Sequence, residues 1–206
     1  MSEMESMLWP VLGSAAAFQA TFWISMSVAP LCFSHYRVLD NSKGEKAYWA
    51  ATFTGVLHAV LIVALCVVAL VDCPELLSTS NFFQATALSQ LCCKVFIGYI
   101  LQDFFLSIYY WSTWPGWEAN LIHHVMVLIV WWQLTAGGYA QGPATVSMLC
   151  ESSTPFVALR WYLDKAGMKT GALAGRRCRA ADMSEAFVRP WPRLEVWLNQ
   201  RGRFCG

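Results

Sequence analysis

The sequence predicts an all-α, multi-pass membrane protein built as a bundle of transmembrane helices. Of its 206 residues, 57% are hydrophobic and 13% are charged, whereas soluble domains hold about 45–50% and about 25%. Long apolar runs recur along the chain as far as Leu163, each close to the ~20 residues that a helix needs to cross a bilayer. This composition excludes a disordered chain, a nucleic-acid-binding protein and an ordinary soluble enzyme.

Five apolar runs are the predicted spans. They cover Leu8 to Phe33, Tyr48 to Val71, Leu88 to Tyr110, Trp117 to Leu134 and Pro143 to Leu163. The first run follows an acidic leader and is longer than the apolar core of a signal peptide, so we expect a retained helix. The third run contains Lys94 and Asp103. The fifth is the weakest, because Glu151, Pro155 and Arg160 interrupt it.

The charge distribution divides the chain into three parts. Residues 1–33 hold an acidic tail and the first span, and residues 34–169 hold spans two to five. Residues 170–206 are basic and irregular, and nine of the 14 Lys and Arg residues lie in 165–206. Because basic segments flank membrane helices on the cytosolic side, we predict a cytosolic C-terminus and an N-terminus on the opposite side.

Ionisable side chains inside the predicted spans are the candidate functional residues, because each costs roughly 2.5–3.5 kcal/mol to insert into a bilayer. At 1.5 Å per residue they fall about 9–15 Å below the cytosolic boundary. They form one predicted polar layer: His58, Asp103, His123, His124 and Glu151. Ser147 and Thr154 share a helix face with Glu151. Since Pro155 cannot donate to the Glu151 carbonyl, we expect this helix to line a polar cavity.

Several uses of this layer are open on chemistry alone. In acid–base catalysis, a His accepts a proton from an attacking amine or hydroxyl while Asp103 or Glu151 orients the ring. In a structural role, the cluster fixes helix packing through hydrogen bonds. A metal ion is disfavoured, since His123 and His124 point about 100° apart. A haem between His58 and the fourth span has no supporting motif. We therefore predict no cofactor and no metal ion.

Short motifs in the last two runs add a family resemblance. Residues 122–125 read Ile-His-His-Val, residues 151–157 read Glu-Ser-Ser-Thr-Pro-Phe-Val, and residues 160–165 read Arg-Trp-Tyr-Leu-Asp-Lys. With His58-Ala59 and the stretch from Gly98-Tyr99 to Asp103, they resemble the TLC domain family over roughly residues 48–169. That family includes ceramide synthases and the translocating-chain-associated membrane protein. The resemblance maps His123 and His124 onto the catalytic pair of the ceramide synthases.

The resemblance implies a protein of the endoplasmic reticulum membrane that acts in membrane lipid homeostasis, with acyl lipids as partners that it binds, senses or modifies. One alternative is an acyl-CoA-dependent N-acyltransferase of ceramide synthase type. Another is a membrane chaperone or cargo receptor that binds other membrane proteins without catalysis. Whether the protein is an enzyme stays open at this point.

The chain departs from the family pattern in two places. Ceramide synthases carry two acidic residues downstream of the double His, where this chain has Glu151 alone. TLC domains also continue with at least one further apolar helix, so we expect the bundle to lack the last helix or helices. Taking layer and resemblance together, we predict as catalytic residues His123, His124, Asp103 and Glu151. The predicted residues of a lipid or substrate cavity are His58, Ser147 and Thr154.

Overall fold

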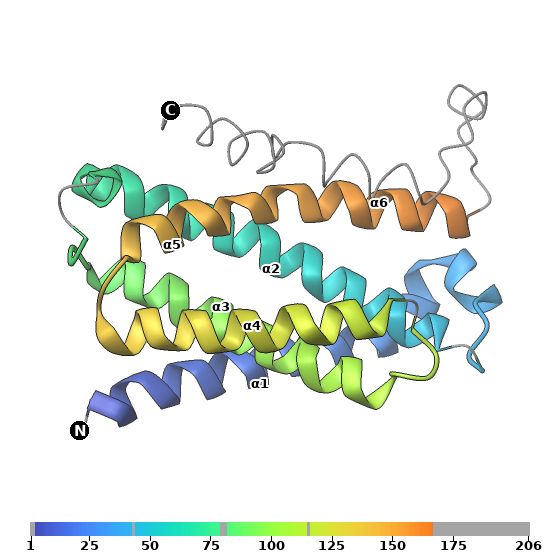
Figure 1. The fold of residues 1–206 in the computed structure, drawn as a ribbon. Helices are drawn as coiled ribbons and strands as arrows, with labels where there is room; N and C mark the ends of the chain where they lie inside the picture. The colour runs from blue at the N-terminus through green and yellow to red at the C-terminus, as the bar shows by residue number, and fades with distance from the viewer. Residues whose placement is uncertain (1–2, 43, 79–81, 115, 167–206) are drawn as a thin grey trace, which may run out of the picture. The chain divides into compact units, whose positions relative to one another are not determined.

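The computed structural model describes residues 3–42, 44–78, 82–114 and 116–166. This part of the chain is helical and contains no strand. Four of its helices are long and apolar enough to cross a membrane: α1 (Glu3–Cys32), α2 (Glu45–Asp72), α3 (Ala87–Tyr109) and α4 (Trp117–Gly137). They alternate in direction along the bundle (Figure 1). The predicted all-α, multi-pass fold is therefore confirmed, while the predicted tail at residues 170–206 lies outside the described residues.

The fifth predicted span, Pro143 to Leu163, is interrupted rather than one continuous α-helix. It consists of α5 (Gln141–Met148), the 3-10 helix η3 (Leu149–Ser153) and α6 (Thr154–Lys165), which follow one another along the bundle (Figure 1). Pro155 has no N–H to donate to the carbonyl of Glu151 four residues earlier. That carbonyl instead accepts the backbone N–H of Thr154, which is the tighter i to i+3 pattern of a 3-10 turn.

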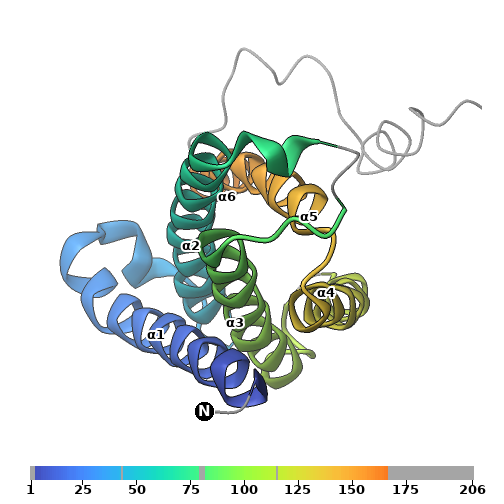
Figure 2. The same ribbon diagram turned by 90° about the vertical axis from the view of Figure 1, so that its left-hand side faces the viewer.

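The central helix of the bundle is α3, which packs against α1, α2, α4 and α5 and lies between α1 and α4 (Figure 2). Its contact with α1 depends on Gly98. A Cβ at this position would lie 2.6 Å from both the Ser14 Cβ and the Val11 carbonyl oxygen. The Ser14 hydroxyl donates to the Val95 carbonyl at 3.0 Å. Small residues and interhelical hydrogen bonds of this kind replace the hydrophobic driving force that is missing between helices in lipid.

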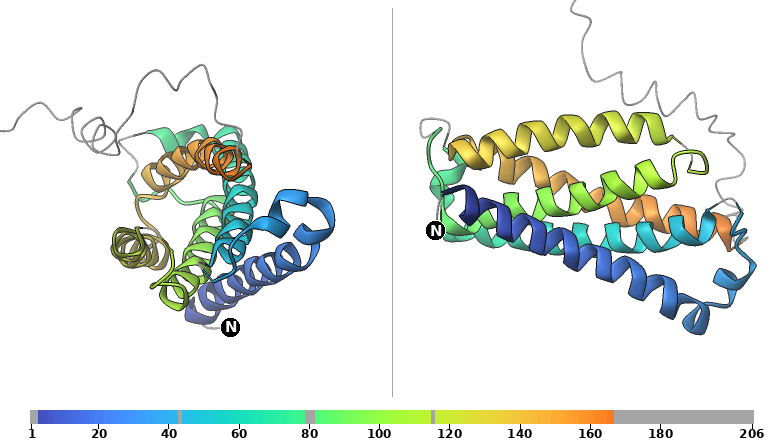
Figure 3. Two further views of the ribbon diagram at one scale, coloured as in Figure 1. Left: turned by 90° about the vertical axis from the view of Figure 1, so that its right-hand side faces the viewer. Right: turned by 90° about the horizontal axis from the view of Figure 1, so that it is seen from below.

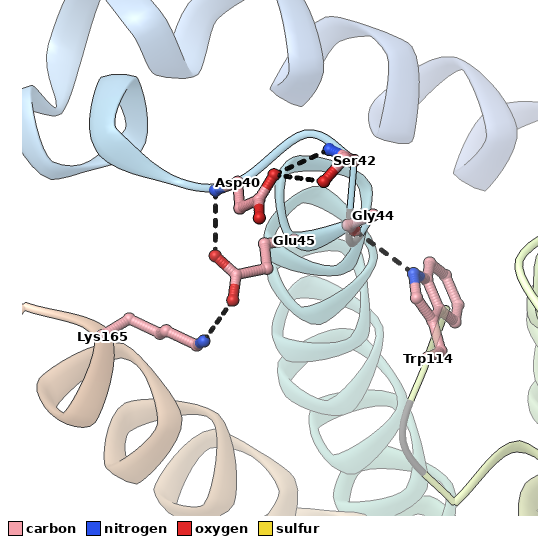
Figure 4. Close-up of polar contacts among 6 residues, drawn as sticks. All are labelled: Asp40, Ser42, Gly44, Glu45, Trp114 and Lys165. Atoms are coloured by element: carbon pink, nitrogen blue, oxygen red, sulfur yellow. Dashed lines mark hydrogen bonds and ion pairs between the residues drawn. The ribbon is translucent and has the colours of Figure 1, made fainter. Parts of the chain in front are cut away.

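Polar contacts tie the loops at one end of the bundle to α2 and α6. Glu45 accepts the backbone N–H of Asp40 at 3.0 Å and the Lys165 ammonium at 2.5 Å. The Trp114 indole N–H donates to the Gly44 carbonyl at 3.3 Å (Figure 4). Gly44 has a left-handed φ of 66°, which glycine adopts without steric cost. These contacts hold the end of α6 and the loop before α4 against the first turn of α2.

We predict that Gly98→Ala destabilises the bundle, because the new methyl group would overlap α1. Overpacking of this kind costs about 1–3 kcal/mol. The matched control is Gly13→Ala, since a Cβ at Gly13 meets nothing within 4 Å and Ala is the better helix former by about 1 kcal/mol. The measurement is the midpoint of thermal unfolding in detergent micelles. Gly98→Ala should lower it and Gly13→Ala should not, so equal midpoints for the two variants would contradict the close packing of α1 on α3.

Candidate functional site

A cavity of about 590 Å³ lies among α2, α3, α4 and α6. This volume falls within the roughly 300–1,000 Å³ of small-molecule sites. α4 and α6 do not pack closely against each other and stand apart in Figure 2. The residues that line the cavity come from these two helices, from α2 and α3, and from the loop before α4. Polar residues that line it are Tyr48, Thr52, Tyr99, Asp103, Ser107, Asn120, His123 and Thr154. Three tryptophans line its outer end, which is the end near the first turn of α4: Trp114, Trp117 and Trp161.

Two polar contacts join α3 to α4 beside this cavity. His124 Nε2 lies 3.4 Å from Asp103 Oδ2, and the Asn120 amide donates to the Ser107 hydroxyl at 2.9 Å. Asp103 and Ser107 are four residues apart on α3, as Asn120 and His124 are on α4. Residues at this spacing lie one above the other on a helix face, so the two contacts are successive rungs between antiparallel helices. Each rung pairs polar groups that would be costly if left bare in lipid.

The side chains of the two adjacent histidines, His123 and His124, point in different directions, one into the cavity and one into the core. His124 is buried against α3, whereas His123 is exposed and lines the cavity. Neighbouring residues on a helix point about 100° apart, and the two ring centroids are 5.7 Å apart. A molecule in the cavity would therefore meet His123 and the Asp103 carboxylate, while His124 would act through its contact with Asp103.

The fifth predicted span contributes Thr154 to the cavity. Thr154 begins α6, and its hydroxyl donates to Glu151 Oε2 at 2.8 Å. The half-buried Glu151 lies in η3 and reaches the site through this hydrogen bond. Ser147 is exposed on α5, where its hydroxyl donates to the Ala144 carbonyl at 2.8 Å. The structure therefore brings Thr154 and Glu151 to the cavity region but not Ser147.

His58 lies behind the cavity wall. Its ring is fully buried and stacks on Tyr99, with centroids 3.7 Å apart and 7° between the planes. Phe18 and Phe96 pack on the same imidazole, each with centroids 5.6 Å away. Because Tyr99 lines the cavity, its ring stands between the cavity and His58. His58 thus supports the wall from inside the α1–α2–α3 core.

The wall also contains neutral polar groups that the sequence analysis did not identify: Tyr48, Thr52, Tyr99, Ser107 and Asn120. The four-residue spacing of neighbours on a helix face could have predicted three of them from the sequence. Tyr99, Asp103 and Ser107 follow at four-residue intervals on α3, and Asn120 precedes His124 by the same interval on α4.

The donor set suits hydrogen bonding and proton transfer. Among the described residues, no three His, Cys, Asp or Glu side chains lie together where they could hold a metal ion. A carboxylate, an imidazole and several hydroxyls instead face one volume, and Val157 and Ala158 add an apolar stretch to its wall. This arrangement can bind a polar group and place hydrocarbon beside it.

Comparisons with known proteins confirm the family resemblance. The sequence model of the TLC domain family matches residues 48–184. The chain is 26% identical to TLC domain-containing protein 4-A of Xenopus laevis over 159 residues, which are 76% of this chain and 60% of that protein. It is 25% identical to TLC domain-containing protein 4-B of Xenopus laevis over 126 residues, 61% of this chain and 47% of that protein.

TLC domain-containing protein 4 of Xenopus tropicalis is likewise 26% identical over 159 residues, with the same coverage of 76% and 60%. The chain thus spans between 47% and 60% of the length of these relatives. No solved structure matches it.

We predict that Asp103 and His124 are energetically coupled and that Asp103 and His123 are not. In a double-mutant cycle with Asp103→Ala and His124→Ala, the coupling free energy should be about 0.6–1.7 kcal/mol, as for polar contacts between membrane helices. The same cycle with His123→Ala is the matched control, since it removes the neighbouring imidazole. Thermal unfolding in detergent measures both. Equal coupling in the two cycles would show that the pairing of Asp103 with His124 is not selective.

Proposed function

This chain belongs to the TLC domain family, and we propose that it acts in membrane lipid homeostasis by binding or modifying acyl lipids in the endoplasmic reticulum membrane. It is a multi-pass membrane protein, since four of the described helices are long and apolar enough to cross a bilayer. The observation that carries the proposal is the cavity of about 590 Å³, because it places a polar wall inside an apolar bundle. Its partners in this role are membrane lipids and acyl-CoA.

The wall of the cavity suits a molecule with a polar end and a hydrocarbon chain. Asp103, Asn120 and His123 offer a hydrogen-bonding surface on the α3–α4 side. Val157 and Ala158 offer an apolar surface on α6. The tryptophans at the outer end favour the headgroup level of a bilayer, where amphipathic rings are enriched. An acyl lipid would thus bind with its polar end toward α3 and α4 and its hydrocarbon toward α6.

Acyl transfer is a second candidate, favoured by one observation: His123 faces the cavity beside the Asp103–His124 pair. In such a reaction, the nitrogen or oxygen of an acceptor forms a bond to the carbonyl carbon of an acyl-CoA, and the carbon–sulfur bond breaks. The His123 imidazole takes the proton of the acceptor and returns it to the departing thiolate. Asp103, held by His124, orients the acceptor.

The first test of the proposed function is lipid mass spectrometry on membranes from cells that express the chain. We expect expression to change the acyl-lipid profile and His123→Ala to reverse that change, because His123 lines the cavity. The matched control is His35→Ala, which removes an exposed imidazole from the 3-10 helix η1 (Ser34–Val38). Protein abundance must be equal in all three lines. A profile that is the same with and without the chain would contradict the proposal.

The second test separates binding from catalysis. Purified protein is incubated with an acyl-CoA and a long-chain amine, and the N-acylated product is measured. If the protein is an acyltransferase, His123→Ala should lower turnover by about 10²–10⁴-fold, the usual contribution of a general base, while His35→Ala leaves it unchanged. Retained lipid without product would assign the cavity to binding alone.

A further inference from the structure

α1 and α4 flank α3 (Figure 3). Residues of these three helices line a second cavity system, on the other side of α3 from the first cavity. It has a polar end and an apolar end. The polar cavity has a volume of about 460 Å³, and its lining includes Lys94, Ser6, Gln90 and Thr135. The apolar groove has a volume of about 410 Å³, and its lining includes Leu8, Leu12, Ile97 and Ile129. Trp132 lines both, so the two spaces adjoin.

The polar end contains a cation inside a membrane-spanning helix. Lys94 lies seven residues into α3 from Ala87, about 10 Å along the axis. Its ammonium donates to the Ser6 carbonyl of α1 at 3.3 Å. This contact has a structural basis, because Pro10 cannot supply the helical N–H that a carbonyl four residues earlier would accept.

Within the part of the chain that the structure describes, the ion pairs are His124 with Asp103 and Lys165 with Glu45, and the ammonium of Lys94 contacts only the neutral Ser6 carbonyl. An ammonium has three N–H donors and the carbonyl takes one of them. Among the described residues that line the polar cavity, none is acidic. A charge at this depth is costly unless an anion pairs with it. The polar end is therefore complementary to a negatively charged group.

The apolar groove extends from this charge along all three helices. On α3 its residues continue from Lys94 to Ile97 and Leu101, and on α4 they continue from Thr135 to Ile129. Its floor is tightly packed, with Ile97 2% exposed, whereas its flanks face outward, with Leu12 41% and Ile129 50% exposed. The groove is thus open along the outward-facing surface of the bundle, and the Lys94 ammonium lies at one end of it.

We propose that this groove binds an anionic glycerophospholipid of the bilayer. The phosphate accepts the two remaining N–H groups of Lys94, and one acyl chain lies along the groove over Ile97. The outward-facing flanks leave room for the second chain to stay in the surrounding bilayer. A zwitterionic headgroup fits less well, because its cation would approach Lys94 and the described lining residues include no acidic side chain to pair with it. Of the described residues that line this site, none lines the cavity of about 590 Å³, so the site does not depend on the function proposed above.

The test measures which lipid the purified protein retains. Protein is equilibrated in mixed micelles with equal amounts of phosphatidylglycerol and phosphatidylcholine, purified again, and its bound lipid is quantified by mass spectrometry. We expect phosphatidylglycerol to be enriched about fivefold, the factor expected from one basic residue near an anionic lipid. Lys94→Gln should abolish the enrichment, and Lys94→Arg should keep it because the charge stays. Equal retention of the two lipids by the unaltered protein, or enrichment that survives Lys94→Gln, would overturn the proposal.

A second pair of variants tests the groove without touching the cation. Leu12→Trp fills the groove from its exposed flank and should abolish the enrichment. Leu61→Trp on α2 is the matched control, since Leu61 is 44% exposed and outside the groove, and it should keep the enrichment. This pair also decides the matter if Lys94→Gln fails to fold. Enrichment that persists in Leu12→Trp would overturn the proposal. A competition with oleate tests the other source of an anionic group: if added oleate displaces phosphatidylglycerol, the ligand is a fatty acid and the proposal is overturned.

Discussion

The contact between Asp103 and His124 is the interaction on which the α3–α4 side of the cavity depends. α4 buries His124, Val127 and Thr135, and its partly buried Leu128, Trp131 and Leu134 pack against the core. In a bilayer, lipid tails compete with neighbouring helices for apolar surface on equal terms. Polar groups do not have this alternative, because lipid offers them no partner. The rungs from Asp103 to His124 and from Ser107 to Asn120 therefore fix both the position of α4 beside α3 and its rotation.

The rotation of α4 decides which imidazole reaches the cavity. With His124 directed at Asp103, helical geometry turns His123 about 100° away, toward the space that α6 borders. The same geometry leaves Asn120 on the cavity side one turn earlier. The cavity thus lies where polar contacts hold α4 to α3 while α4 and α6 do not pack closely against each other. The two polar contacts between α3 and α4 therefore account both for the polar residues of the cavity wall and for the space that separates α4 from α6.

Prolines act on both sides of α3 by removing helical donors. Pro155 converts the turn around Glu151 into a 3-10 segment, and the segment ends with Thr154 at the cavity and its hydroxyl on the Glu151 carboxylate. Pro10 withholds a donor from the Ser6 carbonyl, which accepts the Lys94 ammonium instead. In each case a polar group inside the membrane region obtains its hydrogen bond from a side chain or a tighter turn. Each of these replaced hydrogen bonds lies beside a cavity.

Much of this protein was determined by its sequence alone. Long apolar runs are stable in a bilayer as helices, so the all-α, multi-pass fold and the family followed from residue order. The charges within these runs marked Asp103, His123 and His124 as candidates. Spacing gave their depth along each helix, because rise per residue is constant. It did not give the rotation of each helix about its own axis, which depends on the partners that pack against it.

Tertiary structure therefore decided the finer assignments. Stacking on Tyr99 placed His58 behind the wall although its depth is similar, and packing of α5 left Ser147 exposed. The second cavity system also arises from packing, since Lys94, Trp132 and Leu12 come from three helices and no local pattern joins them. Which side chains share a volume is a property of contacts between helices, and only the folded bundle contains those contacts.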